Sequence, residues 1–148
     1  IYSAVLERGA LGATIPERLV PVLDKARAAE AQGVRFKRPL GDADMTEVYR
    51  QARAHLYPGS ERDMLCSTLA ESQSVGLPCV ARPLGASKER MRDGESGYLV
   101  ADDEAFAAAA KALLLGTDVF NGFSEQARSR QEGEGWEHAA SQLARIFM

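Results

Sequence analysis

The feature that most constrains the fold of this chain is the alternation of short apolar segments with longer segments of helical periodicity. The short segments are predicted as strands at residues 1–6, 34–36, 54–57, 78–81 and 97–100. The longer ones are predicted as helices at residues 14–32, 44–52, 65–75, 87–92, 105–115, 120–130 and 136–147. Strands that alternate with helices form a parallel sheet covered on both faces. The sequence therefore predicts a three-layer α/β fold with a helical C-terminus.

Length and charge limit the class of protein and its partners. The chain of 148 residues fits one domain, predicted to span residues 1–148, and its 45% apolar and 26% charged content is that of a globular domain. A net charge of −3 gives no general attraction to nucleic acid or to an anionic membrane. No apolar run approaches the ~20 residues that span a bilayer. We therefore expect no nucleic-acid partner and no transmembrane segment, and any anionic ligand must be held by local geometry.

Cysteine and histidine usage gives no sign of disulfides or metal. Cys66 and Cys79 show no paired spacing, which favours reduced thiols in a cytoplasmic protein. His55 and His138 lie far apart in the sequence, without the spacing of metal ligands. We expect no metal site.

The most informative stretch is residues 57–81, YPGSERDMLCSTLAESQSVGLPCVA. Parallel sheets bind ligands beyond the carboxyl ends of their strands, so the loop that follows a strand is where a site is expected. Asp63 is predicted just before a helix, and the amides of Met64, Leu65 and Cys66 are predicted at its free N-terminus, which suits a phosphate. Glu71, two turns along, could accept hydrogen bonds from a ribose diol.

This stretch resembles the signature of the family-four (group 1) retaining glycosyltransferases. That signature has a small polar loop after a strand, an acidic residue, seven others, a glutamate, and then small residues, glycine, proline and a valine-rich strand. The downstream LGASKERMRDGESGYLV is similar to the next family segment, and residues 34–36 with Pro39 and Leu40 resemble the strand and loop that accept the nucleobase. The resemblance runs from about residue 34 to the C-terminus. It implies the Rossmann-like C-terminal half of a GT-B fold.

The resemblance also implies the roles of the site residues. Glu71 would bind the ribose hydroxyls, while Asp63 would meet the sugar and its phosphate, so these two acidic residues are the candidate catalytic ones. The remaining binding residues would be Arg38, Pro39 and Leu40 for the base, and Ser60, Met64, Leu65 and Cys66 for the sugar and phosphate.

The activity implied is transfer of a hexosyl unit with retention of configuration, without a metal or other cofactor. The donor would be a nucleoside-diphosphate sugar, most naturally of UDP or GDP, although nothing in the sequence separates uracil, guanine and adenine. The acceptor would be a sugar, glycan or lipid-linked acceptor bound by an N-terminal domain outside this sequence. Polysaccharide biosynthesis in the cytoplasm, or at the inner face of the membrane as a peripheral protein, is the expected setting.

The sequence departs from the family pattern in three ways. Asp63 stands where the family usually has glutamate, and Gly59 precedes Ser60 where Pro-Ser is common. The first strand and helix of the domain, which carry an arginine and a lysine that neutralise the diphosphate, are expected to precede this sequence. We expect the isolated chain to be inactive because the acceptor would be bound by a domain outside this sequence, and we expect Asp63→Glu to be tolerated because it restores the family's usual residue.

Several alternatives stay open. The same fold could serve a nucleotide-sugar epimerase, or a non-catalytic nucleotide-binding or interaction module. Asp63 could be only a helix cap, and Glu71 only a solvated helix residue. The basic run at residues 88–92 could be a solvated face or a contact for phosphate or acceptor.

Overall fold

The computed structural model describes residues 1–132 and 135–147 and divides the chain into two compact units. The first unit is Ile1–Met45 and the second is Thr46–Met148. The prediction of one domain over residues 1–148 stays a prediction. Each unit is described by itself below.

The second unit is built on a parallel sheet of three strands. These are β1 (His55–Tyr57), β2 (Cys79–Ala81) and β3 (Gly97–Leu99), hydrogen-bonded in the order β1-β2-β3. The register aligns their last residues, since Tyr57 is opposite Ala81 and Ala81 is opposite Leu99. The loops that follow the three strands therefore leave the sheet at one edge, and this edge is where the predicted site falls.

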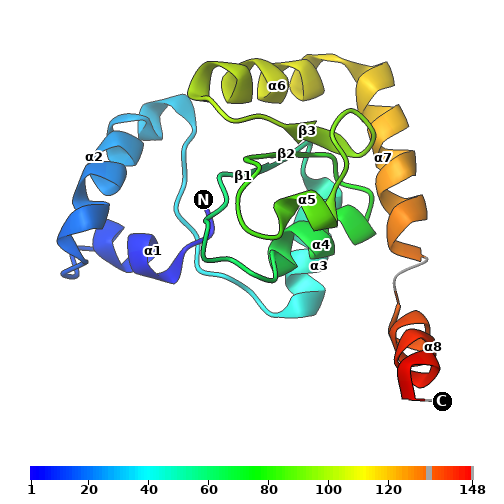
Figure 1. The fold of residues 1–148 in the computed structure, drawn as a ribbon. Coiled ribbons are helices and arrows are strands. Elements are labelled where there is room, and N and C mark those ends of the chain that lie inside the picture. Colours follow the sequence, from blue (N-terminus) through cyan, green and yellow to red (C-terminus); the bar gives the residue numbers. More distant parts are fainter. Residues whose placement is uncertain (133–134, 148) are drawn as a thin grey trace. The chain divides into compact units, whose positions relative to one another are not determined.

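The two faces of the sheet carry separate apolar clusters, and Figure 1 shows helices on both sides of the sheet. On one face, Cys79 and Ala81 of β2 pack against α4 (Ser67–Ser74) and the end of α5 (Ser87–Arg90), through Leu69 and Met91 among others. On the other face, Val80 packs against Leu113 of α6 (Asp103–Leu115). The alternation of side chains along a strand thus places helices on both sides, and the predicted α/β three-layer fold is confirmed.

Two further helices of the second unit follow α6. They are α7 (Thr117–Glu132), whose Phe123 ring packs edge-on against Tyr98 of β3 at 5.0 Å, and α8 (Trp136–Phe147). Both start and end within three residues of their predicted positions, as do β1 to β3 and α4 to α6. Glycine and proline between apolar segments were sufficient to locate these elements.

The first unit differs more from the sequence predictions. Residues 1–6, predicted as a strand, instead lead into α1 (Ala4–Ala10), because the Ser3 hydroxyl accepts the Leu6 amide at 3.3 Å and caps that helix. Residues 34–36 are likewise not a strand: only Tyr2 and Lys37 form an isolated parallel bridge. One bridge is too short to define a strand.

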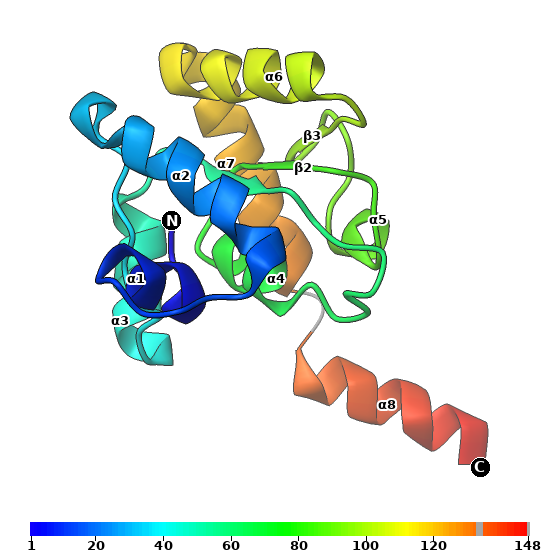
Figure 2. The same cartoon turned by 90° about the vertical axis from the view of Figure 1, so that its left-hand side faces the viewer.

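The long helix predicted at residues 14–32 is broken into three parts. A 3₁₀ turn at Glu17–Leu19 precedes α2 (Val20–Ala28), and another follows it at Glu30–Gln32. Pro21 lies in the first turn of α2, where its missing amide hydrogen costs nothing, so the proline delays the helix. Figure 2 shows α1 and α2, which contact each other through Leu23 and Gly9. The last helix of this region, α3 (Asp42–Gln51), starts two residues before its predicted position and crosses the boundary of the two units along the chain.

Gly85 sits where two loops of the second unit cross. Its φ is +55°, and a Cβ atom there would lie 2.2 Å from the carbonyl oxygen of Asp63 and 2.6 Å from that of Ser60. The next residue, Ala86, donates its amide to the same Asp63 carbonyl at 3.0 Å. The loop after β2 therefore supports the loop after β1, and only glycine permits this approach.

We predict that Gly85→Ala lowers the free energy of unfolding by about 2–4 kcal/mol, because overlap with backbone adds to the strain of a positive φ. Gly94→Ala is the matched control, since Gly94 has a φ of +74° and nothing within 4 Å of its added Cβ. That variant should lose only about 1 kcal/mol. Urea denaturation measures both variants. Equal losses in the free energy of unfolding would contradict the close approach of the two loops at Gly85.

Candidate functional site

The loop between β1 and α4 is organised by the carboxylate of Asp63. Its Oδ1 accepts the amides of Cys66 at 2.8 Å and Leu65 at 3.2 Å, and its Oδ2 accepts a short hydrogen bond from the Tyr57 hydroxyl. Both oxygens are therefore engaged within the loop. Asp63 acts here as a cap and turn residue, which was one of the two roles that its sequence context left open.

These hydrogen bonds shift the acid–base properties of both partners. The bond from Tyr57, followed by that from the Cys66 amide, lowers the pKa of the Asp63 carboxyl. Burial, followed by the hydrogen bond to Asp63, raises the pKa of the Tyr57 phenol. Asp63 is thus ionised and Tyr57 is protonated at neutral pH, which is the arrangement that maintains the bond between them.

The helix after this loop begins later than predicted. It starts at Ser67 instead of Leu65, and Cys66 precedes it in the left-handed conformation with a φ of 43°. The expectation that the Leu65 and Cys66 amides are free at the helix N-terminus is wrong, because Asp63 already accepts both. Within the described residues, the amides of Ser67 and Thr68 have no protein acceptor, so these are the donors that the helix offers to a ligand.

The other predicted carboxylate, Glu71, lies exposed on the first turns of α4. Its Oε2 accepts a hydrogen bond from the hydroxyl of Tyr49 on α3, at 3.4 Å. Tyr49 is itself buried, and this burial together with the Glu71 charge raises the pKa of its phenol to about 12. Glu71 therefore accepts on Oε2 from a hydroxyl that stays protonated at neutral pH, and its other oxygen has no hydrogen-bond donor among the described residues.

A half-buried histidine, His55, stands between the two tyrosines. The ring of His55 lies 5.8 Å from that of Tyr49 and 5.8 Å from that of Tyr57, measured between centroids. Its Nδ1 is 2.7 Å from the Ser72 hydroxyl, which in turn donates to the Leu69 carbonyl at 2.9 Å, so Nδ1 carries the proton. Burial lowers the pKa of His55 to about 4, so the ring is neutral at pH 7.

The basic run at residues 88–92 contributes one contact to the loop. The Arg90 Nε donates to the Leu65 carbonyl at 2.9 Å, so its guanidinium lies beside the turn that precedes α4. The sequence offered no signal for this contact. Arg92, by contrast, pairs with Glu95 at 3.6 Å on the surface.

The remaining predicted binding residues fall into two groups. Ser60 and Met64 are exposed in the same loop as Asp63, and the Ser60 hydroxyl accepts the Arg62 amide at 3.3 Å. Arg38, Pro39 and Leu40 belong to the first unit, where they are exposed after the Tyr2–Lys37 bridge. The structure therefore brings together Asp63, Ser60 and the residues of α4 in the second unit. The predicted base-binding residues belong to the first unit.

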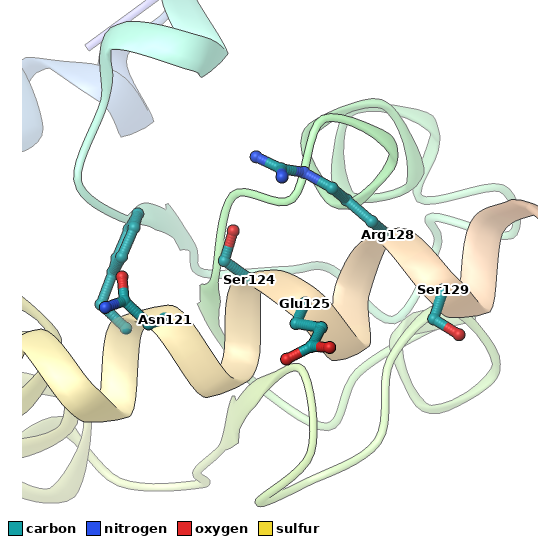
Figure 3. A pocket seen from close by; sticks show the side chains of 6 residues that line it. Asn121, Ser124, Glu125, Arg128 and Ser129 are labelled. Carbon is teal, nitrogen blue, oxygen red and sulfur yellow. The ribbon is translucent and has the colours of Figure 1, made fainter.

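A hollow of the second unit lies elsewhere, along α7. It has a volume of about 470 Å³ and is lined by Phe120, Asn121, Ser124, Glu125, Arg128 and Ser129. Figure 3 shows that these side chains come from successive turns of the one helix. The Arg128 side chain also donates from Nε to the Val75 carbonyl at 3.2 Å. Because this hollow is not at the carboxyl ends of the strands, it lacks the elements of the predicted site.

The part of the chain that the structure describes holds neither a cluster of metal-ligating side chains nor a membrane-spanning helix. No three His, Cys, Asp or Glu side chains gather so that they could hold a metal ion. No helix among the described residues is long and apolar enough to cross a membrane.

Comparison with known proteins identifies the family. Residues 14–115 match the family model described as "Glycosyl transferases group 1". The chain belongs to the group 1 glycosyltransferase family. The match includes Asp63, Glu71 and all three strands, so the family assignment and the site rest on the same segment.

Individual glycosyltransferases are similar to most of this chain. A "Phosphatidyl-myo-inositol mannosyltransferase" of Mycobacterium leprae is 32% identical over 123 residues, which are 77% of this chain and 31% of the relative. A "D-inositol 3-phosphate glycosyltransferase" of Streptomyces griseus is 29% identical over 124 residues, 82% of this chain and 26% of the relative. One of the same description from Actinosynnema mirum is 28% identical over 92% of this chain and 32% of the relative. The chain thus spans about a third or less of the length of these relatives.

The shifted pKa of His55 predicts how stability depends on pH. The unfolded chain binds a proton near the ordinary pKa of 6.5, whereas folded His55 resists protonation until about pH 4. Stability from this group is therefore complete above pH 6.5 and is lost as the pH falls toward 4, by about 3 kcal/mol in total. His55→Gln keeps a donor for Ser72 without the titration, so urea denaturation should show a weaker pH dependence for this variant between pH 7 and 4. An unchanged pH dependence would contradict the assignment.

The geometry of Asp63 reverses the expectation that Asp63→Glu is tolerated. A glutamate moves the carboxylate one methylene away from the backbone, so it cannot keep the bonds to Tyr57 and to both amides. We predict a lower midpoint of thermal unfolding for Asp63→Glu than for Asp63→Asn, which retains the length and one oxygen acceptor. The opposite order would show that charge, and not length, determines the loop.

Proposed function

We propose that this chain is the donor-binding domain of a retaining glycosyltransferase that transfers a hexosyl unit from a nucleoside-diphosphate sugar to an acceptor such as a growing glycan. The observation that carries the proposal is the arrangement of α4. Its N-terminus offers the amides of Ser67 and Thr68, and Glu71 follows within the next turn at the carboxyl edge of a parallel sheet. Such an edge is where sheets of this class bind nucleotides.

The diphosphate is proposed to lie at the start of α4. Free backbone amides and the positive end of the helix dipole attract an anion, and they need no reorganisation as negative charge develops on the leaving group. Arg90 supports this placement, because its side chain already contacts the adjacent turn through the Leu65 carbonyl. These elements would stabilise the departing nucleoside diphosphate when the bond to the sugar breaks.

The ribose is proposed to bind Glu71. A carboxylate can accept hydrogen bonds from both hydroxyls of a ribose, and the oxygen of Glu71 that Tyr49 does not bind is available for this. Ser60 and Met64 would then lie nearer the sugar, and Arg38, Pro39 and Leu40 would meet the base. UDP or GDP is the proposed nucleotide.

One observation favours a second candidate, a nucleotide-binding module without transferase activity. Asp63, at the position where the family usually has a sugar-binding glutamate, has both carboxylate oxygens engaged inside its own loop. A donor site that no longer transfers sugar would retain the nucleotide contacts and lose this one. Sugar transfer by the full-length protein separates the two candidates, because only the first predicts it.

We predict that Glu71→Ala weakens binding of UDP or GDP to the full-length protein about tenfold. Each hydrogen bond to a charged acceptor contributes roughly 1.5–3 kcal/mol, so the loss of one such bond gives this magnitude. Glu125→Ala is the matched control: Glu125 is also an exposed helix glutamate, but it lines the hollow on α7. Isothermal titration calorimetry measures both variants. A larger loss from Glu125→Ala than from Glu71→Ala would move the nucleotide site to α7.

A further inference from the structure

We propose that Tyr49 is a positioning residue of the donor site, whose hydroxyl fixes the Glu71 carboxylate in the orientation that a ribose diol requires. This inference rests on the proposed function. It assigns a role to a residue on the part of α3 that belongs to the second unit, and α3 contributes no other residue to the proposed donor site.

Among the described residues, Glu71 is the one hydrogen-bond partner of the Tyr49 hydroxyl. The hydroxyl donates to Oε2 of that residue at 3.4 Å, and the tyrosine side chain is buried with 8% of its surface exposed. Glu71 itself is exposed, so without this bond its carboxylate would sample several rotamers in water. A buried donor beneath an exposed acceptor therefore restricts the acceptor, and this restriction lowers the entropy that a ligand must overcome on binding.

The ring of Tyr49 packs against a residue of the sheet, His55 of β1. It lies 5.8 Å from the His55 ring, at an interplanar angle of 38°. His55 is fixed in turn by the Ser72 hydroxyl at 2.7 Å, and Ser72 follows Glu71 directly on α4. Tyr49 is thus positioned, through His55 and Ser72, by the same turn of α4 that carries Glu71. The hydroxyl and the carboxylate therefore keep their relative position.

His55 also contacts the second tyrosine of the site. Its ring is 5.8 Å from that of Tyr57, at an interplanar angle of 70°, and Tyr57 donates to Asp63. Each candidate carboxylate is therefore bound by one tyrosine, and both tyrosines pack on one neutral histidine. Tyr49 therefore bonds to Glu71 as Tyr57 bonds to Asp63.

The test compares ribose with a nucleotide that lacks the diol. Dissociation constants for UDP and GDP and for their 2′,3′-dideoxy analogues are measured on the full-length protein, with Tyr49→Phe and Glu71→Ala. Tyr49→Phe should weaken the ribonucleotide by about three- to tenfold and leave the dideoxy analogue unchanged. The double variant should bind no more weakly than Glu71→Ala, because the hydroxyl acts only through Glu71.

Tyr98→Phe provides a matched control. Tyr98 packs on Phe123 in the same unit, and within the described residues its hydroxyl makes no hydrogen bond, so its removal should change no affinity. Thermal unfolding establishes that each variant is folded. Glu71→Gln, a change on an exposed helix position, supplies a second double-mutant cycle. Tyr49→Phe should weaken ribonucleotide binding less in the Glu71→Gln background than in the unmodified protein.

The outcomes separate this proposal from the one on which it rests. If Glu71→Ala discriminates ribose from dideoxyribose and Tyr49→Phe does not, the donor site stands and the positioning role is overturned. If Tyr49→Phe weakens both nucleotides equally, its effect is structural and the role is overturned as well. If Glu71→Ala itself shows no discrimination, the proposed ribose contact fails, and the role of Tyr49 fails with it.

Discussion

The engagement of the Asp63 carboxylate is the interaction on which the rest of the site depends. One carboxylate oxygen receives the hydroxyl of Tyr57, at the end of β1, and the other receives two amides of the turn that leads into α4. The carbonyl of the same residue accepts the amide of Ala86, so the loop after β2 is joined to the loop after β1. Because Asp63 takes up the Leu65 and Cys66 amides, the helix begins at Ser67, and the free donors move to Ser67 and Thr68. A single aspartate therefore determines which amides before and at the start of α4 are already engaged within the loop.

Helix α4 has one face in the core and one face exposed at the carboxyl edge of the sheet. Its buried face carries Leu69 and Gln73, and the Gln73 side chain donates to the Ser96 carbonyl at 3.0 Å in the turn before β3. Its exposed face carries Glu71, with Thr68 one turn before it. Movement of the helix would break buried hydrogen bonds, which are costly to leave unmade. A ligand at the exposed face consequently meets groups whose positions are determined by the interior of the domain.

Much of this could be predicted from sequence, because the strongest signals were local. Gly76 and Pro78 locate the end of α4 and the start of β2, and the apolar segments between breakers locate the sheet. The errors arose where a tertiary or capping interaction decided the outcome. Ser3 as a cap outweighed the apolar character of residues 1–6, and the left-handed Cys66 delayed α4. An aspartate two and three residues before Leu65 and Cys66 is an Asx-turn signal that could have revealed the occupied amides. No sequence pattern could have paired Tyr49 with Glu71, since that contact joins residues 22 apart.

The most direct test of the account is to follow the backbone amide signals of Ser67 and Thr68 by NMR while UDP, GDP or ADP is added. We predict that one nucleoside diphosphate shifts these two amides and that of Glu71, while the amide of Ala105, already bonded to the Asp102 carboxylate at 2.8 Å, does not move. It would be contradicted if the largest shifts fell on Asn121 to Ser129 of α7. Saturable binding that left Ser67 and Thr68 unaffected would contradict it equally.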